Sequence, residues 1–150
     1  MYRGIMAVNR DPRVRAFALE HLAQELKHLA FFDDWLTSRD TSALLPLWRL
    51  SGWALGLLAG LAGPRAVFTT VDAVEEFVVE HYGQQLTRLG ESGQWPELYQ
   101  VLWRFCADED RHRWDALQRH PAWGRSGIAA AWSRVVGAGS KAAVWLARAF

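Results

Sequence analysis

Apolar residues recur at spacings of three and four along almost the whole chain, and no stretch alternates in the manner of a strand. Proline and glycine divide this pattern into segments. Asp11 and Pro12 form a helix cap followed by a first-turn proline, so they should open a long helix. We predict an all-α protein with a short fragment at 1–9, helices at 11–35, 44–63, 64–89, 96–120 and 128–149, and breaks at 37–42, 90–93 and 121–127.

The lengths of the connections indicate how these helices are arranged. Helices joined by short turns pack as antiparallel neighbours, and most of the predicted turns are short. The passage from Trp35 to Pro64 is longer and fits the crossover of a helical bundle. A chain of 150 residues with no internal repeat or linker is expected to form one domain.

Three of the predicted helices carry charged residues inside their apolar stripes. Glu25 and His28 interrupt the stripe of the first long helix, and Glu75 lies in that of the helix after Pro64. Glu109 and His112 interrupt a third stripe. An ionised carboxylate buried without partners costs several kcal/mol, and no lysine or arginine stands at neighbouring stripe positions. These inward carboxylates therefore favour a bound cation.

The Glu-x-x-His spacing strengthens this interpretation. It places a carboxylate and an imidazole on one helical face, as bridging and terminal ligands of iron or manganese require. Chance would give roughly 0.26 such pairs in this sequence, and an isolated match is weak. Here both pairs coincide with inward stripes, which favours a metal site over an accidental or purely structural pattern.

Other polar residues receive structural interpretations. His21 lies one turn before Glu25 and is within reach of a metal, but we predict a hydrogen-bonded histidine in the core or at its rim. Glu76 and Glu80 should be solvated surface charges, and Cys106 a small core residue rather than a nucleophile.

His81 and Tyr82 have two interpretations. Tyr82 is almost two helical turns beyond Glu75, whereas His81 is about 120° off that face. Either they orient the metal ligands through hydrogen bonds, or they pack with a polar tip. Both interpretations stay open.

Composition narrows the class of protein. With 17 Lys and Arg against 16 Asp and Glu, the chain has no basic excess that would indicate nucleic acid. The single cysteine excludes an intrachain disulfide, and the first residues lack a secretory signal pattern. Nine tryptophans favour membrane interfaces, protein interfaces or a large apolar pocket.

The apolar tract at 44–63 is a poor transmembrane helix, because Arg49 leaves too few residues for the roughly 20 that a span needs. Gly52, Gly56 and Gly60 form a smooth stripe that another helix can approach closely. Either the tract is buried in the bundle or in a dimer, or it inserts into one leaflet of a membrane and admits an apolar substrate. We favour the second.

The sequence resembles the demethoxyubiquinone hydroxylase family, the di-iron monooxygenases of late ubiquinone biosynthesis. The resemblance runs from Tyr2 to about Ala147. It rests on Gln24-Glu25-Leu26-Lys27-His28-Leu29, Leu44-Leu45-Pro46-Leu47-Trp48-Arg49, Gly52 with Ala54-Leu55-Gly56, Ala73-Val74-Glu75, His81-Tyr82 with Gln85-Leu86, Asp108-Glu109 with His112, and Lys141-Ala142-Ala143-Val144-Trp145-Leu146.

The resemblance implies a single ferritin-like di-iron domain over 1–150, a four-helix bundle with an additional apolar crossover helix and a C-terminal helix. It implies two iron ions, dioxygen as co-substrate, and electrons ultimately from NADH. The expected partners are a demethoxyubiquinone-like quinone, membrane lipid, and a homo-oligomer or a ubiquinone-biosynthesis complex, on the cytoplasmic face of a bacterial inner membrane. By position, His81 and Tyr82 resemble the family's catalytic pair. Five residues resemble its iron ligands: Glu25, His28, Glu75, Glu109 and His112.

One family ligand has no counterpart in this sequence. The family carries a glutamate seven residues before a tyrosine that resembles Tyr2, and that position would precede Met1. The first helix is therefore expected to be shortened by a misassigned start or a truncation, or the ligand has been lost; we favour a start that lies too far downstream. The alternative functions are a non-catalytic quinone-binding or assembly bundle and another ferritin-like oxidoreductase.

Overall fold

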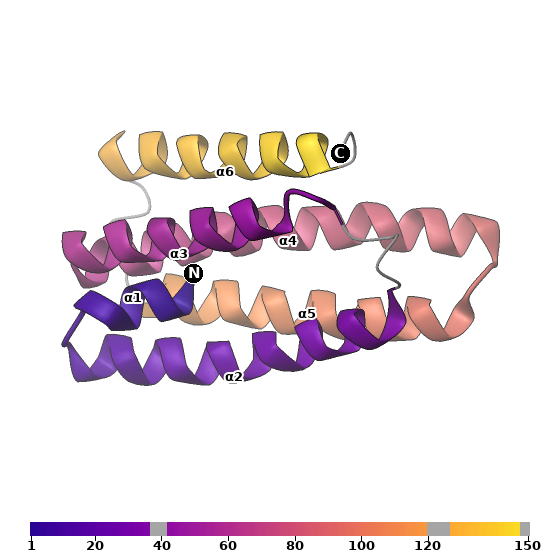
Figure 1. Cartoon of the computed structure of the whole chain (residues 1–150), viewed down its shortest axis with the longest axis horizontal. Coiled ribbons are helices and arrows are strands. Elements are labelled where there is room, and N and C mark those ends of the chain that lie inside the picture. Colours follow the sequence, from indigo (N-terminus) through magenta and orange to yellow (C-terminus); the bar gives the residue numbers. More distant parts are fainter. Residues whose placement is uncertain (37–41, 120–126, 148–150) are drawn as a thin grey trace. The chain divides into compact units, whose positions relative to one another are not determined.

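The computed structural model of the protein describes residues 1–36, 42–119 and 127–147. Within these ranges the chain forms six helices and no strand, which confirms the all-α, ferritin-like class (Figure 1). The helices are α1 (Tyr2–Val8), α2 (Pro12–Trp35), α3 (Leu45–Ala62), α4 (Pro64–Ser92), α5 (Pro96–Arg119) and α6 (Gly127–Ala147).

The predicted boundaries agree with these helices within a few residues, except at the end of α4. The turn predicted at 90–93 is wrong over its first part, because α4 continues to Ser92. A single glycine lowers helix stability by only about 1 kcal/mol, so Gly90 does not end a helix of this length. Gly93 does leave it, with a left-handed φ of 61°. Residues 121–126 of the break predicted at 121–127 and residues 37–41 of that predicted at 37–42 lie outside the described residues, as do residues 120, 148 and 149. Gly127 is described, and it begins α6 rather than ending the break.

The chain divides into two compact units. The first unit is residues 1–67 with 141–150, and the second is residues 68–140. The single domain expected over 1–150 stays a prediction.

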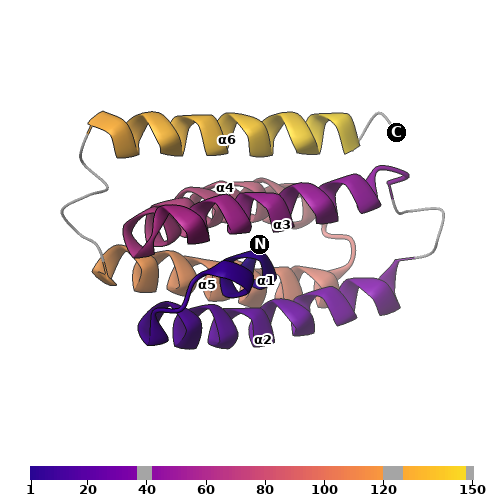
Figure 2. The same cartoon turned by 60° about the vertical axis from the view of Figure 1, so that its left-hand side comes forward.

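In the first unit, α1 packs lengthwise on α3, as the glycine stripe predicted (Figure 2). A Cβ added at Gly56 would collide with the backbone carbonyl of Met1, and one added at Gly60 would lie 3.0 Å from the carbonyl oxygen of Ile5. Gly4 on α1 meets the backbone of Trp53 in the same way. Glycine is required here because the two backbones approach more closely than side chains allow.

The connection from α1 to α2 is held by side-chain hydrogen bonds. Asn9 donates from its amide to the Gly60 carbonyl on α3 over 3.0 Å and accepts from the Asp11 backbone N–H over 3.0 Å. The Asp11 carboxylate then caps α2 by accepting from the Arg13 N–H over 2.8 Å, as the sequence predicted. These bonds fix the start of α2, on which Glu25 and His28 lie.

In the second unit, α4 and α5 run antiparallel. Two contacts set their register: Arg113 on α5 reaches Asp72 on α4, and the Cys106 thiol lies 3.8 Å from the carbonyl oxygen of Val79. The helix α6 is joined to α4 by a hydrogen bond of 2.8 Å from the indole N–H of Trp132 to the hydroxyl of Thr70.

The bond between Trp132 and Thr70 should contribute measurably to stability. The Thr70 side chain is buried, so Trp132→Phe removes a donor from a hydroxyl that water does not reach. We expect a loss of about 1 kcal/mol, seen as a lower urea midpoint. The control is Trp145→Phe, at an indole that is 70% exposed. Equal midpoints for Trp132→Phe and the parent chain would show that this bond contributes nothing.

Candidate metal centre

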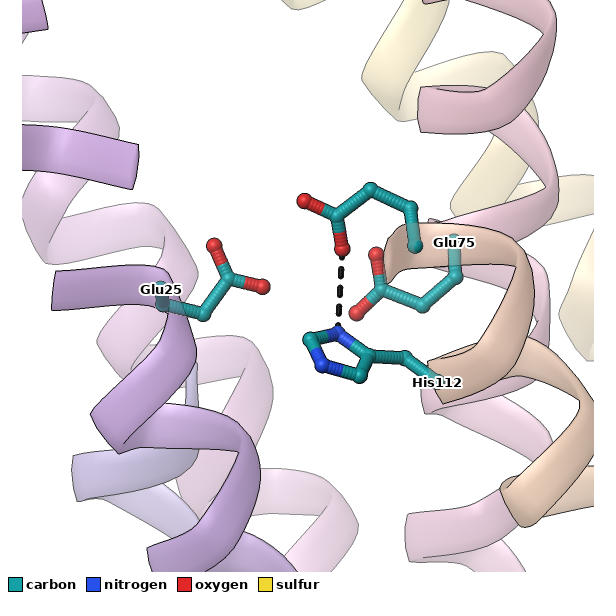
Figure 3. A group of neighbouring side chains, drawn as sticks. Glu25, Glu75 and His112 are labelled. Carbon is teal, nitrogen blue, oxygen red and sulfur yellow. Dashed lines mark hydrogen bonds and ion pairs between the residues drawn. The ribbon is translucent and has the colours of Figure 1, made fainter. Parts of the chain in front are cut away.

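The second unit brings three of the predicted ligand residues together. Glu75 extends from α4 and His112 from α5, as Figure 3 shows, and Glu109 precedes His112 on α5 by three residues. Each offers a ligand atom, and these atoms lie within 4.8 Å of one another. All three residues are buried, with exposures of 2% for each glutamate and 4% for His112.

The helical repeat explains why these side chains point inward. Glu109 and His112 share the buried face of α5 with Leu102 and Ala116, as the apolar stripe predicted. Their i, i+3 spacing lets Nδ1 of His112 donate to Oε2 of Glu109 over 3.0 Å, the dashed line in Figure 3. Glu75 follows the buried Val71 by one turn of α4. The antiparallel register then sets Glu75 beside the α5 pair.

Beside these three residues lies a charged cluster that sequence reasoning missed. The Arg113 guanidinium is 3.3 Å from an Asp72 carboxylate oxygen, 3.4 Å from one of Glu76 and 3.9 Å from one of Asp110. Burial raises the pKa of Asp72, while Arg113 works in the opposite direction. The i, i+4 spacing of Asp72 and Glu76 was visible in the sequence, but a partner on another helix was not.

The donor set suits a transition metal. Two carboxylates and an imidazole gathered at a buried point are ligands that iron and manganese accept. Buried carboxylates this close repel each other unless a proton or a cation compensates them. The chemistry of these three residues therefore fits an iron site.

The other predicted ligands lie on α2, in the first unit. His28 is buried and Glu25 is half-buried, and Figure 3 draws Glu25 on its helix. His21, one turn before Glu25, is buried and hydrogen-bonded to the Tyr2 hydroxyl over 3.4 Å. The prediction of a core histidine at 21 is thus confirmed.

The remaining structural interpretations agree with the structure at Glu76 and Glu80 and only in part at Cys106. Glu76 and Glu80 are exposed, as predicted. Cys106 is half-buried, and burial raises the pKa of its thiol, which disfavours the nucleophilic thiolate. The prediction that Cys106 is a core residue is therefore wrong, whereas the raised thiol pKa agrees with the prediction that it is not a nucleophile.

His81 and Tyr82 are half-buried on α4, and neither belongs to the group of three ligand residues. The His81 ring stacks on that of Phe77 at 5.8 Å and 14°, and its Nε2 accepts from the Gln85 side-chain amide over 2.8 Å. This bond fixes the ring orientation. A role for the pair in catalysis stays a prediction.

The apolar tract forms the single helix α3. Its 18 residues have a mean hydropathy of 1.2, long and apolar enough to cross a membrane by length and composition alone. Only 17% of the helix is buried, so its apolar residues do not serve mainly as the core of this chain.

Comparison with known proteins decides the family. The family model for the ubiquinone biosynthesis protein COQ7 matches residues 1–147. The chain belongs to this family. The predicted resemblance is therefore confirmed over nearly the whole sequence.

Named relatives in the COQ7 family agree with this assignment. A Rhodospirillum rubrum protein called 3-demethoxyubiquinol 3-hydroxylase is 33% identical over 97% of this chain and 68% of its own length. A mouse mitochondrial protein called NADPH-dependent 3-demethoxyubiquinone 3-hydroxylase is 32% identical over 100% of this chain and 70% of its own. A Dictyostelium discoideum protein of the same name is 29% identical over 97% and 68%. The two mitochondrial names specify NADPH, whereas the sequence resemblance implied NADH; the reductant of this chain stays a prediction.

Proposed function

We propose that this member of the COQ7 family is a di-iron monooxygenase that hydroxylates a demethoxyubiquinone-like ring in ubiquinone biosynthesis. The observation that carries the proposal is the convergence of buried Glu75, Glu109 and His112 from two helices. The names of the relatives supply the reaction class. Because the ring C–H becomes C–OH and the second oxygen atom of dioxygen leaves as water, the reaction consumes two electrons and two protons.

In this proposal, Glu25 and His28 on α2 join the three residues of the second unit as ligands. Their support is the repeated Glu-x-x-His spacing on an inward stripe, together with the family match. Two bound irons would activate dioxygen. The protein residues hold the metals, exclude water from the ring, and move protons, for which the half-buried His81 and Tyr82 on α4 are our candidates.

Labelled oxygen tests this function directly. Purified chain loaded with Fe(II) receives a reductant, ¹⁸O₂ and a short-tailed demethoxyubiquinone. We expect about two irons per chain and one ¹⁸O atom in the hydroxylated quinone. An unchanged quinone with well under two irons per chain would refute the oxygenase and favour a non-catalytic quinone-binding module. Dioxygen consumption with an unchanged quinone would indicate another ferritin-like oxidase.

We further propose that α3 attaches the protein peripherally to a membrane, at the cytoplasmic face of a bacterial inner membrane. Four leucines fall within an arc of about 80° on this helix, away from the glycine stripe that faces α1. They are 49 to 67% exposed: Leu47, Leu50, Leu58 and Leu61. Such a face buries its apolar area when it enters the headgroup region of a leaflet, beside a membrane-soluble quinone.

Replacing Leu58 and Leu61 by glutamine should weaken binding to lipid vesicles. Each buried leucine contributes about 1.5 to 3 kcal/mol, so the double variant should partition at least tenfold less into vesicles in a flotation assay. The matched control is Leu19→Gln on α2, at a leucine 61% exposed. If the double variant floats like the parent chain, this face of α3 is not the membrane anchor.

A further inference from the structure

Arg113 lies next to His112 in the sequence and extends from α5 to α4. Its Nε donates to Asp72 over 3.3 Å, and one terminal nitrogen donates to Glu76 over 3.4 Å. These two acceptors flank Glu75, three positions before it and one after. The side chains of Arg113 and Asp72 are 30% and 20% exposed, so this part of the contact is largely shielded from water.

Two contacts on one helix resist both sliding and rotation. Moving α4 by a single residue relative to α5 would displace its acceptors by about 1.5 Å and turn them by about 100°. The planar guanidinium can satisfy two acceptors in one geometry only, unlike the point charge of a lysine. Because Glu75 belongs to the same rigid helix, the position of its carboxylate is fixed at the same time.

The carboxylates on α4 and α5 repel each other, and the contacts of Arg113 oppose this repulsion. In the second unit, α4 presents Asp72, Glu75 and Glu76 towards a helix that carries Glu109 and Asp110. Like charges at this separation push helices apart. The Arg113 side chain stands among three of these carboxylates, where its charge opposes that repulsion. The Glu76 and Asp110 side chains are 63% and 47% exposed, and exposed ion pairs stabilise a fold by little, so the main effect of these contacts should be on geometry.

We propose that Arg113, acting through Asp72, is a positioning residue that holds the Glu75 carboxylate in register with Glu109 and His112 for metal binding. This role rests on the proposed metal function of the three residues. Arg113 itself touches neither metal nor substrate; it acts through the placement of α4.

Titration of the full chain with Co(II) tests the role without any turnover. The binding curve gives the affinity, and the visible absorption bands report the ligand geometry. Residues hydrogen-bonded directly to a metal ligand typically contribute 10- to 100-fold in affinity. Because Arg113 and Asp72 act through the placement of α4, we expect Arg113→Gln and Asp72→Asn each to weaken Co(II) binding by up to about tenfold and to shift the bands. Arg113→Lys should restore part of the affinity. The control is Arg111→Gln, because Arg111 pairs with Asp108 on its own helix.

A double variant separates positioning from general damage. If Arg113 acts through Asp72, adding Arg113→Gln to Asp72→Asn should cause little further loss of Co(II) affinity. Additive losses would show that Arg113 does not act through Asp72. Circular dichroism on every variant identifies those that have unfolded, and Asp72→Asn then probes the contact from the α4 side. Parent-like affinity and bands in Arg113→Gln would overturn the role, and so would a parent chain that binds no Co(II). If the Co(II) effect appears in a chain that does not hydroxylate, only the proposed function fails.

Discussion

Glu109→Ala should abolish hydroxylation while leaving vesicle binding unchanged. Glu109 is 2% exposed, belongs to the predicted ligand set, and accepts a hydrogen bond from His112. Loss of a ligand should exceed the effect of outer partners, so we expect activity to fall by more than about 100-fold. The measurement is hydroxylated quinone formed per chain, with iron content determined on the same samples.

Replacing Glu109 should not lower the melting temperature of the metal-free protein, although it should abolish activity. Removing a buried carboxylate that lies close to Glu75 relieves a desolvation penalty and a repulsion. Metal-free Glu109→Gln, whose amide oxygen can still accept from Nδ1 of His112, should therefore melt no lower than the metal-free parent chain. Glu97→Gln serves as the control, at an exposed glutamate in the first turn of the same helix. Hydroxylation retained in Glu109→Ala would refute the ligand role.

Gly56→Ala should destabilise the first unit, although alanine is normally the better helix former. The new Cβ would collide with the Met1 backbone carbonyl, so α1 and α3 must separate. Overpacking of this kind costs about 1 to 3 kcal/mol, which for a chain of this length corresponds to a drop of several degrees in Tm.

The same substitution at Gly139 should instead stabilise the protein. Gly139 lies inside α6, and nothing is within 4 Å of a Cβ placed there. Gly139→Ala should therefore gain about 0.5 to 1 kcal/mol from backbone entropy and helix propensity. Thermal unfolding followed by circular dichroism compares both with the parent chain. Two shifts of the same sign would show that close packing of α1 on α3 does not determine stability here.

Local patterns predicted most of the helical architecture because helix signals are carried by neighbouring residues. Asp11 and Pro12 predicted the start of α2, and the glycine stripe predicted a close helix contact on α3. The prediction failed where the end of α4 depended on more than one residue, since Gly90 does not terminate it. The inward faces of Glu75, Glu109 and His112 were also predicted, because the 3.6-residue repeat assigns each residue to a face.

The sequence by itself determined which residues can serve as ligands: two Glu-x-x-His pairs and one further glutamate on apolar stripes. Only the tertiary structure decided that Glu75 meets Glu109 and His112, and that Arg113 reaches Asp72 on the neighbouring helix. The physical reason is that helical periodicity fixes the direction of a side chain, whereas the distance between two helices depends on their register. Register is set by many weak contacts between residues far apart in the chain, and no local pattern encodes them.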